Sequence, residues 1–187
     1  MINELKKIYS ETHILGNAIL FLIVCGAGFI DFGYPKVSIV LGALAFVLGF
    51  NLHDCIDYGR RFHGYITLTA MENTPEGTST LVPIYDKSIA AYRAEQWYVM
   101  LLLGGLIWFI SPWSVLWGFI MWQFCVADFF FYLVLKEPLV KMHYFWLENW
   151  SVIAMVLRPV SLIKFVSMAL LGLILPLIWM VINLIKG

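Results

Sequence analysis

The densest group of side chains that could do chemistry lies within residues 51–63. It combines an imidazole with two carboxylates, at His53, Asp54 and Asp57. Residues three or four apart share one face of a helix, so Asp57 would face the same way as each of the other two. Carboxylate oxygens are the ligands that hard divalent cations prefer. The spacing therefore predicts acid–base groups and metal ligands in one place.

Polar residues on either side of these three could bind a substrate. Asn51 precedes them, and Arg60 and Arg61 follow them. Guanidinium groups bind phosphate oxygens through paired hydrogen bonds, so the arginines could hold an anionic head. The alternative is a solvated helix end whose arginines meet anionic lipid headgroups. The sequence leaves both interpretations open.

Four further ionisable residues lie elsewhere in the chain. Asp128 follows Cys125 in an aromatic run, about two turns from the expected end of its helix. A carboxylate there pairs with a cation, stays protonated or forms a structural hydrogen bond. Glu95 precedes an apolar run. His143 and Glu148 lie about 140° apart around a helix, so each would meet partners from other helices.

We expect these residues to line one polar pocket. The expected acid–base residues are His53, Asp57, Glu95 and Asp128. The expected substrate-binding residues are Asn51, Arg60 and Arg61. The expected metal ligands are Asp54, Asp57, His143 and Glu148. A divalent metal ion is the one cofactor that this set suggests.

The composition places the pocket in a membrane protein. Of 187 residues, 61% are hydrophobic and 13% are charged. Soluble domains are nearer half apolar and a quarter charged, so the surplus apolar surface must face lipid. The formal net charge of zero gives no attraction to nucleic acid. Three cysteines, an odd number, argue against a disulfide framework.

The apolar runs predict an all-α bundle forming a single membrane domain over residues 1–187. A helix needs about 20 apolar residues to cross the hydrocarbon layer. Five runs approach that length: Ile14–Ile30, Val37–Leu52, Trp97–Ile110, Ser114–Leu135 and Ser161–Ile185. Leu139–Leu157 is expected to lie in the interface or to form a short sixth span. Threonine-rich alternation around a Pro/Gly turn predicts a small cytoplasmic β-hairpin over residues 64–85.

The distribution of basic residues predicts a cytoplasmic N-terminus. With the 139–157 segment in the interface, every Lys and Arg except Lys36 and Lys186 falls on the inner side. Loops that stay in the cytoplasm carry such an excess of positive charge. The predicted pocket then belongs to the cytoplasmic leaflet.

Two families of membrane enzymes have motifs similar to this region. Asp54-x-x-Asp57-Tyr58-Gly59-Arg60-Arg61 resembles the start of the CDP-alcohol phosphotransferase motif, Asp-x-x-Asp-Gly-x-x-Ala-Arg. Its glycine is displaced by one position and the downstream Asp-x-x-x-Asp is missing, so half of that metal site is lacking. The Asn and Asp residues at 51, 54 and 57 are similar to those of membrane prenyltransferases. Their spacing is shorter, and the chain has about half the spans of that family.

Three functional hypotheses follow from the sequence. The first is a membrane enzyme that acts on a lipid or isoprenoid substrate at the cytoplasmic leaflet. The second is a small transporter or proton pathway that uses Asp128. The third is an accessory membrane subunit of a larger complex. The expected partners are membrane lipids and a lipidic small molecule, with no nucleic acid, and a homo-oligomer is left open.

Overall fold

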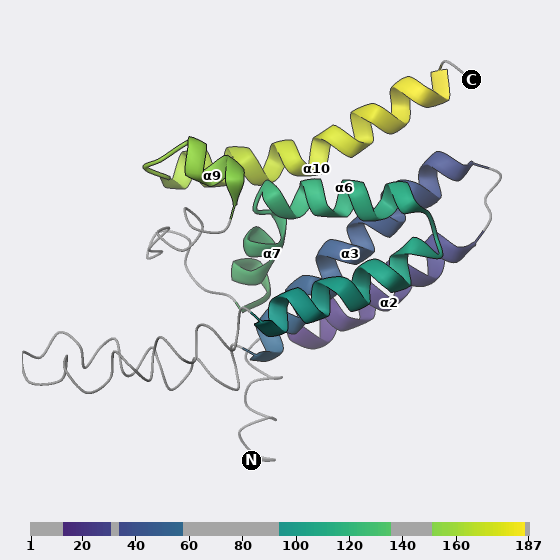
Figure 1. Ribbon diagram of the computed structural model, residues 1–187, viewed down its shortest axis with the longest axis horizontal. Coiled ribbons are helices and arrows are strands. Elements are labelled where there is room, and N and C mark those ends of the chain that lie inside the picture. The colour runs from purple at the N-terminus through teal and green to yellow at the C-terminus, as the bar shows by residue number, and fades with distance from the viewer. Residues whose placement is uncertain (1–12, 31–33, 58–93, 136–150, 186–187) are drawn as a thin grey trace, which may run out of the picture.

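The computed structural model describes residues 13–30, 34–57, 94–135 and 151–185, and these are helical with no strand. The expected all-helical class is confirmed. Residues 94–108 are helical and are called helix 94–108 below. The other helices, drawn in Figure 1, are α2 (Ile14–Phe29), α3 (Pro35–Asp57), α6 (Pro112–Gln123), α7 (Val126–Leu135), α9 (Val152–Val156) and α10 (Leu162–Ile185).

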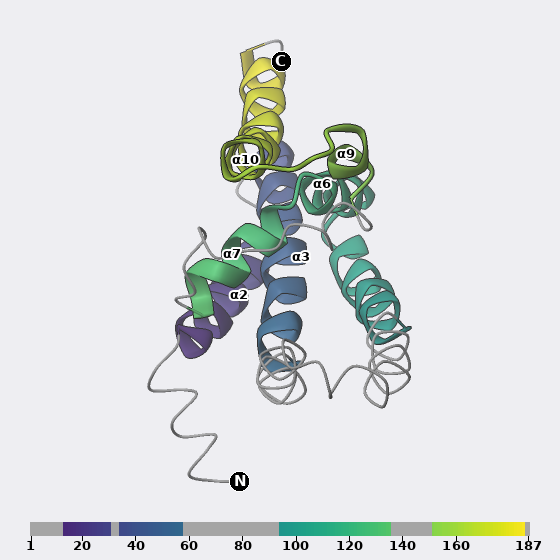
Figure 2. The ribbon, with the colours of Figure 1, turned by 90° about the vertical axis from the view of Figure 1, so that its left-hand side faces the viewer.

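Helix α3 is the centre of the bundle. It packs against α2, α6, α7 and α10, and Figure 2 shows it between them. Every residue from 45 to 51 is buried, and the side chain of Phe46 is only 1% exposed. A helix that is apolar on all sides can be enclosed in this way. By contrast, α10 lies at the periphery: 28% of its apolar stretch is buried, whereas 61% of the apolar stretch of α3 is buried.

Glycines allow the helices around α3 to approach closely. A Cβ atom added to Gly118 of α6 would lie 2.8 Å from the Cβ atom of Phe46. A Cβ atom added to Gly42 would lie 2.5 Å from the hydroxyl oxygen of Ser114. Small residues give membrane helices the close van der Waals contact that replaces a hydrophobic driving force. The interface between α3 and α6 therefore depends on glycine on both sides.

The expected continuous helix over Ser114–Leu135 is wrong. The axes of α6 and α7 differ by 69°, and the chain bends at Phe124 and Cys125. Cys125 adopts a φ of 61°, in the left-handed region that an L-residue seldom enters. Helix α7 consequently turns across the ends of α2 and α3 (Figure 1), where the backbone N–H of His13 donates to the carbonyl of Val134 at 2.7 Å.

The expectation of five transmembrane helices is also wrong. Within the described residues, two helices are long and apolar enough to cross a bilayer, over Pro35–Ile56 and Leu162–Ile185. The bent pair α6 and α7 raises this to three if it is counted as one span. Helix α2 has only 16 residues. Apolar runs in the sequence include turn and cap residues, which is why counting their lengths overestimated the spans.

Two smaller fold predictions have different outcomes. The β-hairpin over residues 64–85 is not supported, because the described residues contain no strand and that segment lies outside them. The described part of the 139–157 segment contains α9, a helix of five residues. Five residues are far too few to cross a bilayer.

A matched pair of glycine substitutions tests the packing of α6 on α3. Gly118→Ala places a methyl group against Phe46, whereas Gly105→Ala meets nothing within 4 Å. Both glycines are helical, so alanine gains the same intrinsic helix propensity at each, and the difference isolates the clash. Overpacking should make Gly118→Ala less stable than Gly105→Ala by about 1–3 kcal/mol. Thermal unfolding in detergent measures this, and equal stabilities would contradict the close contact.

Candidate functional site

The C-terminal half of α3 carries a buried polar group that holds α7. The side chain of Asn51, 0% exposed, donates from Nδ2 to the carbonyl oxygen of Ala127 at 3.0 Å. Its Oδ1 accepts from the thiol of Cys55 at 3.8 Å. Both ends of the amide are therefore used, which offsets the cost of burying it. The contact joins α3 to the first turn of α7.

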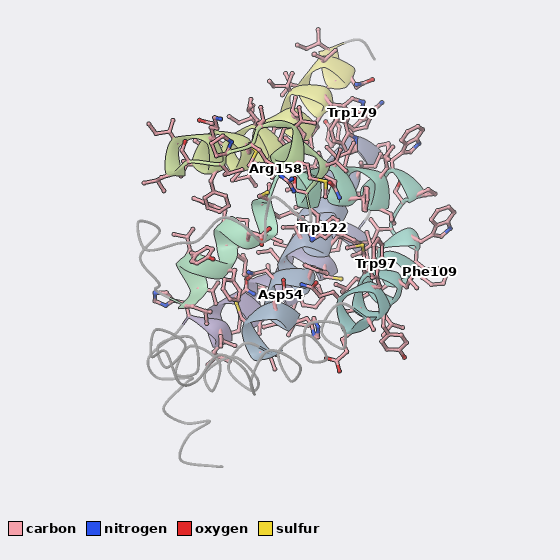
Figure 3. All side chains as sticks on the ribbon, turned by 60° about the vertical axis from the view of Figure 1, so that its left-hand side comes forward. Asp54, Trp97, Phe109, Trp122, Arg158 and Trp179 are labelled. Carbon is pink, nitrogen blue, oxygen red and sulfur yellow. The ribbon has the colours of Figure 1, made fainter. Side chains whose placement is uncertain are left out.

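A second polar contact joins α3 to helix 94–108. Gln96 donates from Nε2 to Oδ1 of Asp54 at 3.2 Å, and Asp54 is only 8% exposed. Figure 3 marks Asp54 on the side of α3 that faces helix 94–108. The Oε1 atom of Gln96 is buried and has no hydrogen-bond partner among the described residues. We call Asn51, Asp54, Cys55 and Gln96, which bring three elements together, the polar junction.

Asp128 lies next to the polar junction. It follows Ala127, the residue whose carbonyl accepts from Asn51, and it stands in the first turn of α7. Its side chain is half-buried. A carboxylate in the first turn of a helix is stabilised by the positive end of the helix dipole. The bend thus places this acid in the first turn of a helix that lies across the end of the bundle, and Asp128 is still about two turns from the C-terminal end of that helix at Leu135, as expected.

The bend that positions Asp128 is held by α9 and α10. The hydroxyl of Ser151 donates to the carbonyl oxygen of Gln123, and Oε1 of Gln123 accepts from the backbone N–H of Val152 at 2.8 Å. Gly172 of α10 packs so closely on Phe124 that an added Cβ atom would lie 2.6 Å from that residue's Cβ atom. The bond from Ser151 supplies a partner for the carbonyl of Gln123 at the end of α6, where carbonyl groups lack partners within the helix.

Five of the predicted site residues lie in the described part of the chain: Asn51, His53, Asp54, Glu95 and Asp128. Asn51 and Asp54 belong to the polar junction. His53 and Glu95 are half-buried neighbours in sequence of Asp54 and Gln96. Asp57 is the last residue of α3, but its side chain is not described. The other four predicted residues lie outside the described residues: Arg60, Arg61, His143 and Glu148.

The predicted metal site remains a prediction. Among the described residues, no group of three or more His, Cys, Asp or Glu side chains could hold a metal ion. Of the four expected ligands, only Asp54 has a described side chain, and its Oδ1 accepts from an amide.

Two residues with structural roles, Gln96 and Ser151, were not predicted. Nothing local in the sequence indicates the contact of Gln96 with Asp54, 42 positions away. The role of Ser151 could have been predicted, because a serine directly before an apolar run is typical of a helix N-cap. Its hydroxyl does accept from the backbone N–H of Ala154 at 3.0 Å.

The middle of α3 has apolar side chains, and the buried polar side chains packed near it from other helices are Asn17, which donates to the carbonyl of Leu48 at 3.4 Å, and Ser114, which packs on Gly42. Phe46, Val47, Leu48 and Phe50 occupy the middle of α3, and each is at most 1% exposed. At the opposite end of the bundle an open hollow of about 270 Å³ lies between the ends of α2, α3 and helix 94–108. Among the described residues, the polar groups gathered on α3 therefore belong to one end of it.

Comparisons with protein-family models, with curated proteins and with solved structures found no match.

A double-mutant cycle tests the contact between Asp54 and Gln96. Hydrogen bonds to charged groups contribute about 1.5–3 kcal/mol, so Asp54→Ala and Gln96→Ala should show a coupling energy of at least about 1 kcal/mol. The free energies of unfolding in detergent give this value. Asn183 donates within α10 to the carbonyl of Trp179, so Asn183→Ala should add independently to Asp54→Ala. Additivity of the Asp54 and Gln96 substitutions would contradict the contact.

Proposed function

We propose that the chain is a membrane enzyme that acts on the polar head of a lipid or isoprenoid substrate at the cytoplasmic leaflet. The observation that carries the proposal is the polar junction, which joins α3, helix 94–108 and α7 at one end of an apolar bundle. A lipid substrate has its polar head at the membrane surface and its chain in the hydrocarbon layer. A site for it needs polar groups at one end of the helices and apolar surface along them.

Burial separates the expected roles of the acids. Asp54 is buried and accepts from Gln96, so in the proposal it orients its neighbours. Asp128, Glu95 and His53 are half-buried, and we assign them to acid–base work on the substrate. Arg60 and Arg61 follow α3 in the sequence and would supply positive charge for an anionic head. A divalent cation bound by Asp54 and Asp57 remains part of the proposal.

The apolar core favours catalysis over transport. A transporter or proton pathway needs a polar route from one face of the membrane to the other. The middle of α3 instead presents Phe46 and Phe50. One observation favours the rival: broken helices occur at the ion and substrate sites of transporters, and the bend between α6 and α7 is of this kind. The rival would use Asp128 as its titrating group.

We also propose that the polar junction faces the cytoplasm. The turn between α9 and α10, which carries Arg158 in the sequence and is followed by Lys164, lies toward the same side of the bundle as the C-terminal end of α3 (Figure 1), whereas the start of α3, which carries Lys36, lies at the other end. Because an excess of positive charge is typical of the cytoplasmic side, the proposal puts the N-terminus there as well.

Replacing Asp128 tests catalysis directly. The full chain, expressed in a heterologous host, should change the lipid profile of the membranes, as measured by mass spectrometry. Because positioned acid–base groups contribute about 100-fold or more to rate, Asp128→Asn should remove most of that change. Asp31→Asn, which removes an acid between α2 and α3, is the matched control and should leave it intact.

Two results would overturn the assignment to an enzyme. One is a lipid profile that does not differ between host cells that express the wild-type chain, cells that express Asp128→Asn and cells that express neither chain. The other is proton flux in proteoliposomes that requires Asp128 while no lipid product forms, which would establish the transport rival. Metal analysis of the purified chain and of Asp54→Asn separately tests the divalent cation.

Thiol labelling tests the orientation. Tyr34 and Ser161 are exposed near opposite ends of the bundle, and the native cysteines are buried. A membrane-impermeant maleimide should label Tyr34→Cys in intact cells and Ser161→Cys only after the membrane is opened. The reverse pattern would place the polar junction on the outer side.

A further inference from the structure

The turn between α9 and α10 carries positive charge. Arg158 and Lys164 are both exposed, and Figure 3 marks Arg158 at this turn. No Asp or Glu occurs in the sequence after Glu148. The C-terminal part of the chain is therefore basic, with two of its cations within seven residues of one another.

Lys164 is held in place by the turn itself. Its Nζ donates to the carbonyl oxygen of Leu157 at 2.9 Å and to that of Pro159 at 3.0 Å. The carbonyl groups at the end of a helix lack partners within the helix, and a cation is stabilised there. An ammonium group has three N–H donors, so one is left after these two bonds. The charge is thus fixed beside Arg158 with a donor to spare.

Apolar side chains around the two cations are unusually exposed. Val156 and Ile163 are each 78% exposed, and Val152 is 61% exposed. They belong to α9 and to the start of α10, on either side of the turn. A segment that combines basic groups with exposed apolar side chains is typical of the boundary between headgroups and acyl chains.

We propose that the turn of residues 157–161, together with Lys164, binds the headgroup of an anionic phospholipid. The lipid phosphate would accept from Arg158 and from the remaining donor of Lys164, while the acyl chains would cover Val156 and Ile163. Free phosphate would satisfy the charges and leave the apolar side chains exposed. The combination therefore fits a lipid better than a soluble anion, and it does not depend on any reaction at the polar junction.

Lipid retention by the purified full chain tests this site. The protein is loaded in neutral detergent with equal amounts of phosphatidylglycerol and phosphatidylcholine, and the retained lipids are measured by mass spectrometry. The wild-type chain should retain more phosphatidylglycerol. Each cation removed should lower that preference by about five-fold, in Arg158→Gln and in the double variant Arg158→Gln, Lys164→Gln. Lys36→Gln removes a charge at the other end of the bundle and should leave the preference unchanged.

The outcomes distinguish a bound phospholipid from a soluble anion. A phosphatidylglycerol preference that is equal in wild type and in Arg158→Gln overturns the proposal. So does displacement of the lipid by inorganic phosphate at concentrations near that of the lipid, which would indicate an anion site without acyl-chain contact. Lys164 also holds the turn, so Arg158→Gln alone decides the result if the double variant does not elute as a single folded species.

Discussion

The interruption between α6 and α7 requires hydrogen-bond partners, because hydrocarbon offers none to the backbone groups that a broken helix leaves unpaired. One such partner comes from elsewhere in the chain, because Ser151 donates to the carbonyl of Gln123 at the end of α6. Asn51 adds a bond to the carbonyl of Ala127 in the first turn of α7. Elements far apart in sequence are thereby fixed around one bend, and the direction of α7 follows from it.

The same requirement explains why polar residues occur in the central helix. Helix α3 is enclosed by its neighbours, so a buried polar side chain in it is costly unless it forms hydrogen bonds. Asn51 uses both ends of its amide, and Asp54 accepts from Gln96. These residues serve stability whether or not they serve chemistry. The half-buried acids beside them, above all Asp128, are the groups that a substrate could reach.

The sequence was sufficient to predict the helical class and the apolar character, because both follow from composition. It was insufficient for the spans. Nothing at Phe124 and Cys125 signals a bend, since neither is glycine or proline, and only the contacts of Gln123 and Gly172 reveal why the helix ends there. Tertiary contacts overrode the local pattern of Ser114–Leu135.

Tertiary contacts also limited how much of the candidate site could be predicted from the sequence. Gathering of polar groups at one end could be inferred from where they fall along the apolar runs. The pairing of Asp54 with Gln96 could not, because it depends on how α3 and helix 94–108 lie against each other. Local sequence patterns contain no information about such a pair. The half of the predicted set that lies outside the described residues stays a prediction.

Helices α2 and α10 differ in length in a way that bears on the surrounding bilayer. At 1.5 Å per residue, the 16 residues of α2 extend about 24 Å and the 24 residues of α10 extend about 36 Å. A hydrocarbon layer of about 30 Å is too thick for the first and too thin for the second. Helix α10 would need to tilt by about 34° to fit, whereas α2 is too short to reach across the layer. The two helices would therefore meet the surrounding lipids differently, α10 along the full thickness of the hydrocarbon layer and α2 along only part of it.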